Sequence, residues 1–374
     1  MKPIRILHVV TYMGRGGLET MLMNYYRQID RNEVQFDFLV HRDFEADYDK
    51  EILKLGGKIY HLPRLNPLDY RYLKKLDEFF QQHKEYKIVH SHINTLSVFP
   101  LYAAKCAKVP VRIAHSHSTT NKKEWKKNLL KQVLRQFSKV YATNYMCCSE
   151  LAGRWLFGNK EYDKGNVYLL NNAIDLDKFK YDEKIRKQKR KELNINDSTL
   201  VIGHIGRFVA QKNHTFLIDI FNEVHKQNND SLLMLVGQGP LMNEIQEKVN
   251  NLGLKDSVIF LGQRNDANEL YQAMDIFVLP SLYEGLGMVL IEAQINDLYV
   301  LASTEVPLEA QISNKIEFLN LNKDLWKQRM IDLKASRKKF FLKLSNYNLF
   351  DIKEQAGKLE KKYEEMIDYG CNKK

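Results

Sequence analysis

Two glutamates eight residues apart, Glu284 and Glu292, enclose the short segment Gly285-Leu286-Gly287. The apolar run 275–279 before them predicts a buried strand, and the residues from Met288 onward predict the start of a helix. Glycine lets the backbone approach a ligand closely, and the first N–H groups of a helix have no intrahelical acceptor. These N–H groups carry the positive end of the helix dipole, so the segment predicts a phosphate site. Carboxylates do not suit phosphate, so they predict hydroxyl groups elsewhere on the ligand, as in a nucleotide-sugar. Two surface acids beside an ordinary glycine turn are the alternative.

Two cations five residues apart, Arg207 and Lys212, follow the predicted strand 200–206 and precede a predicted helix at 215–227. Cations on a loop beside a helix N-terminus can hold a diphosphate from two directions. A pair of solvated surface cations is the alternative. The same half of the chain holds the glutamate segment, which favours a shared phosphate site.

Two histidines, His115 and His117, end the predicted strand 111–117. Residues two apart share one face of a strand, and parallel sheets bind ligands at the carboxyl ends of their strands. A hydrogen-bonded structural histidine is the alternative, and His90 and His92 repeat the spacing as a competing pair.

Strand-like and helical segments alternate along the 374 residues, which suits two domains. This alternation predicts an α/β fold with parallel sheets covered on both faces. The first strand and helix enclose Gly14-Arg-Gly16-Gly17, which differs from the G-x-G-x-x-G dinucleotide fingerprint. The basic run 184–191 predicts a solvated helix face.

The Glu-x7-Glu segment and the Arg-x4-Lys pair together resemble the retaining family 4 glycosyltransferases of GT-B architecture. The resemblance implies two Rossmann-like domains facing across a cleft, with a C-terminal helix that crosses back to the first domain. It implies an acceptor-side domain at 1–171, a nucleotide-sugar domain at 172–349 and the returning helix at 350–374.

The resemblance also implies a role for each matching residue. Glu292 is expected to bind the nucleotide ribose, and Glu284 to lie against the transferred sugar, a position shared with His117 or His115. The single sequence leaves these two histidines open, with His117 preferred. The expected contacts of the donor phosphates and base come from Gly16, Gly17, Arg207, Lys212, Gly262, Gln263, Gly285, Leu286 and Gly287.

The activity implied by the resemblance is transfer of a sugar from a nucleoside-diphosphate sugar, most often UDP-linked, with retention and without a metal or other cofactor. Segments such as Asn171-Asn-Ala-Ile-Asp175 are similar to the exopolysaccharide and capsule branch, which implies a glycan acceptor on a lipid diphosphate. A sugar-nucleotide epimerase of the same fold and a non-catalytic basic scaffold are the alternatives.

The formal charge of +11 requires an anionic partner. The segment Lys122–Lys139 combines an apolar stripe with basic residues and predicts a helix that lies on an anionic membrane surface, or one that packs on the sheet. No nucleic-acid-binding motif accompanies the charge, so nucleic acid is not expected. No apolar run reaches the roughly 20 residues of a membrane span. The expected location is the cytoplasm, with peripheral binding at the inner face of the membrane.

Overall fold

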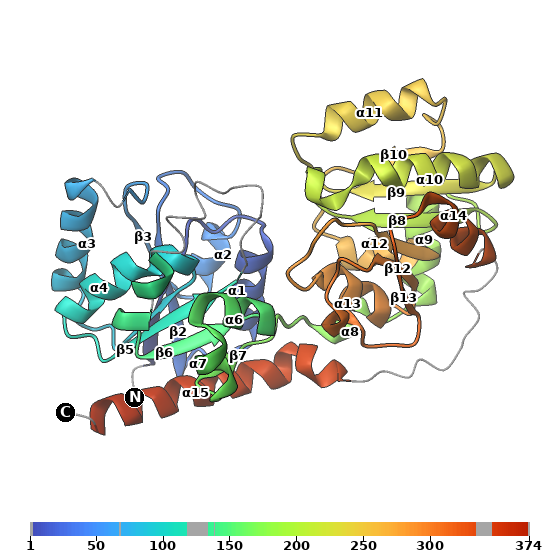
Figure 1. Ribbon diagram of the computed structural model, residues 1–374. Coiled ribbons are helices and arrows are strands. Elements are labelled where there is room, and N and C mark those ends of the chain that lie inside the picture. Colours follow the sequence, from blue (N-terminus) through green and yellow to red (C-terminus); the bar gives the residue numbers. More distant parts are fainter. Residues whose placement is uncertain (1–2, 67–68, 118–133, 138, 334–345, 373–374) are drawn as a thin grey trace. The chain divides into compact units, whose positions relative to one another are not determined.

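The computed structural model describes residues 3–66, 69–117, 134–137, 139–333 and 346–372. The chain divides into two compact units (Figure 1). The N-terminal unit holds Met1–Ile174 with Asn348–Lys374, and the second unit holds Asp175–Tyr347. The boundaries expected from the sequence, 171/172 and 349/350, differ from these by three and two residues.

The N-terminal unit is built on a seven-stranded parallel sheet with the order β3-β2-β1-β4-β5-β6-β7. Strands β2 and β4 are buried throughout, as expected where helices cover both faces of a parallel sheet. The strands are β1 (Ile4–Val9), β2 (Val34–Val40), β3 (Ile59–His61), β4 (Ile88–Ser91), β5 (Val111–Ser116), β6 (Asn144–Cys147) and β7 (Val167–Leu169).

Two apolar layers cover this sheet. One joins alternate strand residues to α1 and α15, and the other joins the remaining strand residues to α3, α4 and α6. Side-chain caps begin two of these helices, from Asp69 at α3 and Ser149 at α6. The helices are α1 (Gly17–Gln28), α2 (Asp49–Lys54), α3 (Tyr70–Gln82), α4 (Val98–Cys106), α6 (Glu150–Phe157), α7 (Asn159–Asp163) and α15 (Ile352–Asn372).

The second unit holds a six-stranded parallel sheet with the order β10-β9-β8-β11-β12-β13. The strands are β8 (Leu200–Ile205), β9 (Ser231–Val236), β10 (Val258–Phe260), β11 (Ile276–Leu279), β12 (Tyr299–Ser303) and β13 (Ile316–Leu319). The helices are α8 (Leu176–Phe179), α9 (Glu183–Glu192), α10 (His214–Gln227), α11 (Met242–Asn251), α12 (Ala267–Ala273), α13 (Met288–Ile295) and α14 (Lys323–Asp332). The apolar core on one face joins the strands to α10, α11 and α14.

The last helix, α15, belongs to the N-terminal unit although it follows the second unit in sequence. The chain re-enters beside its own exit, where Ile174 and Asp351 form a parallel bridge. Ala356, Leu359 and Tyr363 then pack into the N-terminal core beside α1. The expected return of the C-terminal helix is therefore confirmed.

The sequence-based expectation of a solvated face for the basic run 184–191 is wrong at Lys189 and Arg190, whereas Lys184, Lys187 and Lys191 are exposed. The run forms most of α9, but α9 packs against α12, so two of its cations are buried. Arg190 is 1% exposed and donates to the carbonyl oxygens of Ala273 and Asn196 at 2.9 and 2.6 Å. The Lys189 ammonium lies 2.9 Å from Asp266. These cations anchor α9 rather than forming a solvated face.

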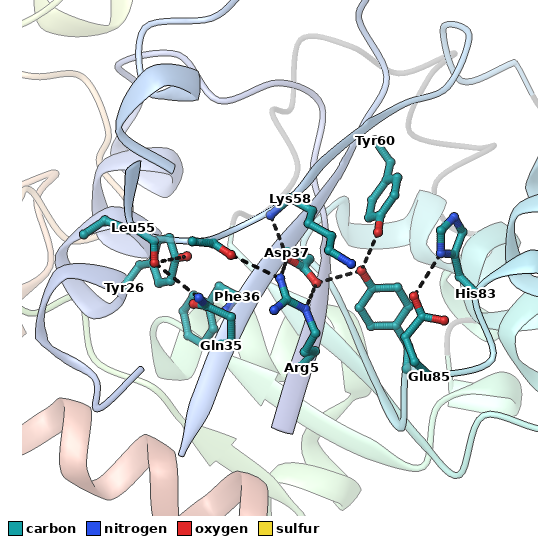
Figure 2. A network of polar contacts seen from close by, with 12 residues as sticks. Arg5, Tyr26, Gln35, Phe36, Asp37, Leu55, Lys58, Tyr60, His83 and Glu85 are labelled. Carbon is teal, nitrogen blue, oxygen red and sulfur yellow. Dashed lines mark hydrogen bonds and ion pairs between the residues drawn. The ribbon is translucent and has the colours of Figure 1, made fainter. Parts of the chain in front are cut away.

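A buried carboxylate ties the first strands of the N-terminal unit together. Figure 2 shows Asp37 on β2 between the guanidinium of Arg5 and the backbone of Lys58. Asp37 accepts from Arg5 Nε at 2.6 Å, from the Lys58 N–H at 2.7 Å and from the Tyr86 hydroxyl at 2.7 Å. Because both charge and hydrogen bonds are matched, this buried acid has a structural role.

The predicted basic helix over Lys122–Lys139 lies outside the described residues except at 134–137 and 139. Among the helices that the structure describes, none combines the length and the apolar composition needed to cross a bilayer.

Candidate active site

The second unit brings the Arg-x4-Lys pair and the Glu-x7-Glu segment to one edge of its sheet. From β8 the chain continues to β9 and β10 on one side, and from β11 to β12 and β13 on the other. Open α/β sheets bind ligands outside the carboxyl ends of the strands at such a reversal of strand order. Arg207 and Lys212 follow β8, and the residues from Glu284 to Gly287 follow its neighbour β11.

Hydrogen bonds of Gln211 and Lys212 join the two loops. The Leu282 N–H donates to the Gln211 carbonyl at 2.8 Å, and the Gln211 amide donates to the Tyr283 carbonyl at 2.8 Å. The Lys212 ammonium lies 2.6 Å from Glu284 Oε1, which also accepts from the Ser281 hydroxyl at 2.6 Å. Motifs 72 residues apart thus form one constellation.

The Lys212–Glu284 pair is mostly enclosed, with side chains 15% and 8% exposed. Removing one partner of such a pair leaves the other charge poorly solvated. Lys212 therefore holds Glu284 in place, while Glu284 fixes the ammonium beside the β8 loop.

Arg207 is exposed, and it makes no ion pair among the described residues. Two glycines after β9 lie against the backbone of the loop that carries Arg207. A Cβ on Gly237 would lie 2.1 Å from the Gly206 carbonyl oxygen, and a Cβ on Gly239 would lie 2.4 Å from that of Phe208. The glycines thus allow the β9 loop to support the Arg207 loop, which presents its guanidinium to solvent.

The helix α13 begins at the segment for which the sequence predicts a phosphate site. Gly287 is its N-cap residue, with φ at +81°, and no side chain caps the helix. A Cβ on Gly285 would meet no atom within 4 Å, so the space outside this turn is open. Leu286 between them is buried and anchors the turn. The uncapped N–H groups of the first turn are therefore available to an anion.

Glu292 lies in the second turn of α13 and accepts a hydrogen bond from the Tyr271 hydroxyl at 2.7 Å. Burial raises the pKa of Glu292, and the hydrogen bond from Tyr271 opposes that rise. Tyr271 on α12 is fully buried, so its hydroxyl is a fixed donor. The contact orients the carboxylate that the resemblance assigns to the ribose.

Gly262 and Gln263 follow β10, two strands away from β8. Gly262 has φ at +65°, and its carbonyl oxygen accepts from the Gly237 N–H at 2.8 Å. Gln263 is exposed. The pair is therefore linked to the Arg207 loop through Gly237 and lies at the outer part of this edge.

In the N-terminal unit the order reverses between β1 and β4, and the paired glycines follow β1. Gly16 is the N-cap residue of α1 and Gly17 is its first residue. A Cβ on Gly17 would meet no atom within 4 Å. Burial raises the pKa of Glu19 in this first turn.

Five histidines gather on one face of the N-terminal sheet: His8, His90, His92, His115 and His117. His8 on β1 pairs with His90 on β4, and the β4–β5 register ends at Ser91 and Ala114, one residue before His92 and His115. His117 follows at the end of β5. The pair His115 and His117 and the competing pair His90 and His92 therefore belong to one cluster.

Hydrogen bonds connect these rings in two separate chains. In the first, His92 lies 2.9 Å from His8 and 2.9 Å from His117. In the second, His90 lies 3.0 Å from His115 and 2.8 Å from the Tyr363 hydroxyl of α15. The two chains stack, with the His115 and His117 ring centres 3.9 Å apart.

Burial keeps the five rings uncharged. It lowers the pKa of His8 and of His117 to about 3 each, and that of His90, His92 and His115 well below the ordinary value. Neutral imidazole is also the form that binds metals, and two sets of three ring nitrogens lie within 4.8 Å of one another. These sets are His8, His90 and His92, and His92, His115 and His117.

The structure separates the roles of His115 and His117. His115 is 0% exposed, and its Nε2 has no hydrogen-bond partner among the described residues. His117 is half-buried at the end of the strand, and its backbone N–H donates to Asn94 Oδ1 at 2.9 Å. A ligand at the sheet edge reaches His117 before His115.

Comparisons with known proteins match this arrangement. A family model described as "Glycosyltransferase Family 4" matches residues 15–178, and one described as "Glycosyl transferases group 1" matches 185–333. EpsF of Bacillus subtilis, a glycosyltransferase by its description, is 39% identical over 307 residues, covering 81% of this chain and 79% of EpsF. The capsular polysaccharide biosynthesis glycosyltransferase CapH of Staphylococcus aureus is 25% identical over 371 residues, covering 96% of this chain and 98% of CapH.

Among solved structures, HepE of Anabaena in complex with UDP and glucose has a TM-score of 0.79 at 18% identity, covering 97% of this chain and 100% of HepE. Two parallel α/β units with a returning C-terminal helix are the GT-B fold, so the fold expected from the sequence is confirmed. The chain belongs to the family 4 glycosyltransferases.

Some residues of these sites were not predicted. Tyr271 gave no signal, because nothing in its helix shows which residue faces Glu292. Gln211 lies inside the Arg-x4-Lys motif, but its contacts depend on the pairing of β8 with β11. Ser281 lies three residues before Glu284 and contacts it locally. His8 was read only as part of a buried strand, although its polar side chain in an apolar run was an available signal.

Proposed function

We propose that the protein is a retaining glycosyltransferase that moves a sugar from a UDP-sugar to a lipid-linked glycan during exopolysaccharide or capsule synthesis. The observation that carries the proposal is the union of the Arg207 loop with the Glu284 turn at the β8–β11 edge. It combines two cations, an uncapped helix N-terminus and two fixed carboxylates, which suits a diphosphate flanked by hydroxyl-bearing groups.

The donor bond breaks with negative charge growing on the departing diphosphate. Arg207, Lys212 and the first N–H groups of α13 are preorganised to stabilise that charge, which is an effective form of catalysis. Glu292, oriented by Tyr271, would accept from the ribose hydroxyls. Glu284 and His117 would hold the transferred sugar, and the leaving phosphate would take the proton of the acceptor.

We propose that this reaction needs no metal, because the cations and helix N-terminus already supply the positive charge that a metal would bring to the diphosphate. The UDP-linked donor is supported by HepE, whose structure contains UDP and glucose. The polysaccharide pathway is supported by CapH. The net charge of +11 supports an acceptor presented at an anionic membrane surface, with the enzyme in the cytoplasm.

The first test is the thermal stability of the purified protein with UDP, GDP, ADP or dTDP, in the presence of a metal chelator. At 100-fold excess over Kd, a ligand stabilises the native state by about 2.7 kcal/mol. We expect UDP to raise Tm. Lys212→Ala removes a charge-assisted contact, which should weaken UDP binding about 10- to 100-fold.

The matched control is Lys226→Ala, an exposed cation on α10 paired with Glu223, which should bind UDP as the wild type does. A Lys212→Ala protein with unchanged UDP affinity would refute the donor site. Binding that appears only with Mg²⁺ would refute the metal-free proposal.

Two alternative activities predict different products. An epimerase of this fold would change the sugar of its nucleotide substrate without any glycan acceptor, and a basic scaffold would bind no nucleotide. Incubation with UDP-sugars and a lipid-diphosphate-linked monosaccharide, followed by mass spectrometry and NMR of the product, distinguishes them. We expect an extended lipid-linked glycan whose new bond keeps the donor's anomeric configuration.

A further inference from the structure

The chain His8–His92–His117 has a consistent direction. His8 Nδ1 lies 2.9 Å from His92 Nε2, and His92 Nδ1 lies 2.9 Å from His117 Nε2. Each link therefore joins the Nδ1 of one ring to the Nε2 of the next. His8 is 0% exposed and His92 is 1% exposed, whereas His117 reaches the edge of the sheet.

Neutral imidazole carries one N–H, so the chain has two arrangements of protons. If His8 donates from Nδ1, then His92 accepts at Nε2, carries its proton on Nδ1 and donates to His117. His117 then also carries its proton on Nδ1. In the reverse arrangement all three protons lie on Nε2, and His117 offers a lone pair at Nδ1.

The buried end of the chain selects between these arrangements. His8 Nε2 is buried and has no hydrogen-bond partner among the described residues. The reverse arrangement would leave a buried N–H without an acceptor, which is a rare and costly state in native proteins. The forward arrangement leaves only an unprotonated nitrogen there, and an unpaired buried acceptor is less rare than an unpaired buried N–H.

We propose that His8 and His92 are positioning residues that fix His117 as the Nδ1–H tautomer, so that His117 presents a hydrogen-bond donor to a ligand oxygen. His117 is then a donor to a sugar hydroxyl rather than a general base. The identity of that ligand as the transferred sugar rests on the proposed function. The direction of the chain does not, because it follows from the contacts within the N-terminal unit.

The direct test is a ¹⁵N NMR spectrum of the full-length protein labelled at histidine, which distinguishes protonated from unprotonated ring nitrogens. We expect His8, His92 and His117 each to show a protonated Nδ1 and a bare Nε2 at pH 7. A protonated Nε2 on His117 would overturn the proposal, whatever reaction the protein catalyses.

A variant at the far end of the chain tests the coupling without touching His117. His8→Asp replaces the donor by a carboxylate that only accepts, so His92 should carry its proton on Nε2 and His117 should change to the Nε2–H tautomer. The matched control, Tyr363→Phe, removes the hydroxyl that bonds His90 in the neighbouring chain, and should leave the His117 tautomer unchanged. An unaltered His117 spectrum in a folded His8→Asp protein would overturn the proposal.

Activity supplies an independent readout. His92→Leu should lower kcat/KM about tenfold, the loss expected for one hydrogen bond, whereas UDP binding to the second unit should persist. His92→Asn keeps an amide donor near Nδ1 and should restore part of the activity, so equal losses in the two variants would contradict the role of that donor. Stoichiometric Zn²⁺ binding by the wild type, lost in His92→Leu, would instead make the cluster a metal site and overturn the tautomer chain.

Discussion

At the scale of single residues, charge and burial are in tension in the donor site. Glu292 is proposed to accept from ribose hydroxyls, which an ionised carboxylate does best, yet burial raises its pKa. Lys212 and Glu284 are enclosed together and stabilise each other. Burying these charged groups costs free energy in the ligand-free protein, and a bound ligand can offset that cost. Such perturbed groups are common at functional positions.

Because Glu292 is both charged and buried, removing its charge should affect stability and UDP binding in opposite directions. A carboxyl group whose pKa is raised by folding destabilises the native state once pH exceeds the folded pKa, and has no such effect below the unfolded pKa of about 4.3. Glu292→Gln keeps an acceptor for Tyr271 but no charge. We therefore expect the ligand-free variant to have a higher Tm than the wild type at pH 8, with the difference vanishing near pH 4.

The same substitution should weaken UDP binding about tenfold or more, because a neutral acceptor bonds ribose hydroxyls less strongly than a carboxylate. Calorimetry with UDP and thermal unfolding across pH measure both effects. A Glu292→Gln protein that is less stable than the wild type at pH 8 would show that this carboxylate is structural.

At the scale of elements, the loops after β8, β9 and β11 act as one support for the phosphate site. The β9 loop can approach because Gly237 has no Cβ and adopts φ at +136°. We expect Gly237→Ala to destabilise the second unit by about 2–4 kcal/mol, since the new methyl group must displace backbone. UDP affinity should fall with it, because the Arg207 loop moves.

The matched control is Gly253→Ala, in the turn after α11. Gly253 also has positive φ, at +71°, but a Cβ there would meet no atom within 4 Å. Gly253→Ala should lower the free energy of unfolding by only about 1 kcal/mol, because it strains the backbone conformation without crowding any neighbour. UDP affinity should be unchanged. Urea unfolding of both variants separates crowding from backbone strain. Equal costs would show that the contact with Gly206 is unimportant.

Much of the donor site could be predicted because its motifs are local. The Glu-x7-Glu spacing and the Arg-x4-Lys spacing each lie within one strand–loop–helix unit, and parallel strands place such units at a common edge. The histidine chains could not be predicted, because they depend on which strands are neighbours and in what register. Arg190 was misread for a similar reason: sequence shows a basic helix face but not the helix that packs on it.

At the scale of the whole molecule, the second unit is continuous in sequence, whereas the N-terminal unit needs two separate segments. We expect residues 175–347 alone to fold and to show a UDP-dependent rise in Tm, because they contain their own core and all the proposed donor residues except Gly16, Gly17 and the histidines. Residues 1–174 alone should not fold stably, because α15 supplies Leu359, Tyr363 and Met366 to their core.

Adding a peptide of residues 348–374 to the 1–174 fragment should restore its helical circular dichroism and chemical-shift dispersion. A stable 1–174 fragment would show that the returning helix is dispensable. Failure of the 175–347 fragment to bind UDP while folded would place an essential donor contact in the other unit.

The return of α15 also sets an order of events on the ribosome. Residues 1–174 lack the core contacts of α15 until that helix leaves the ribosome. The second unit is therefore able to fold before the N-terminal unit is complete. The sheet with the proposed donor site can thus form early, and the histidine-bearing sheet forms late. Because Tyr363 bonds His90, a nascent chain without α15 still lacks the hydroxyl that holds one of the two histidine chains.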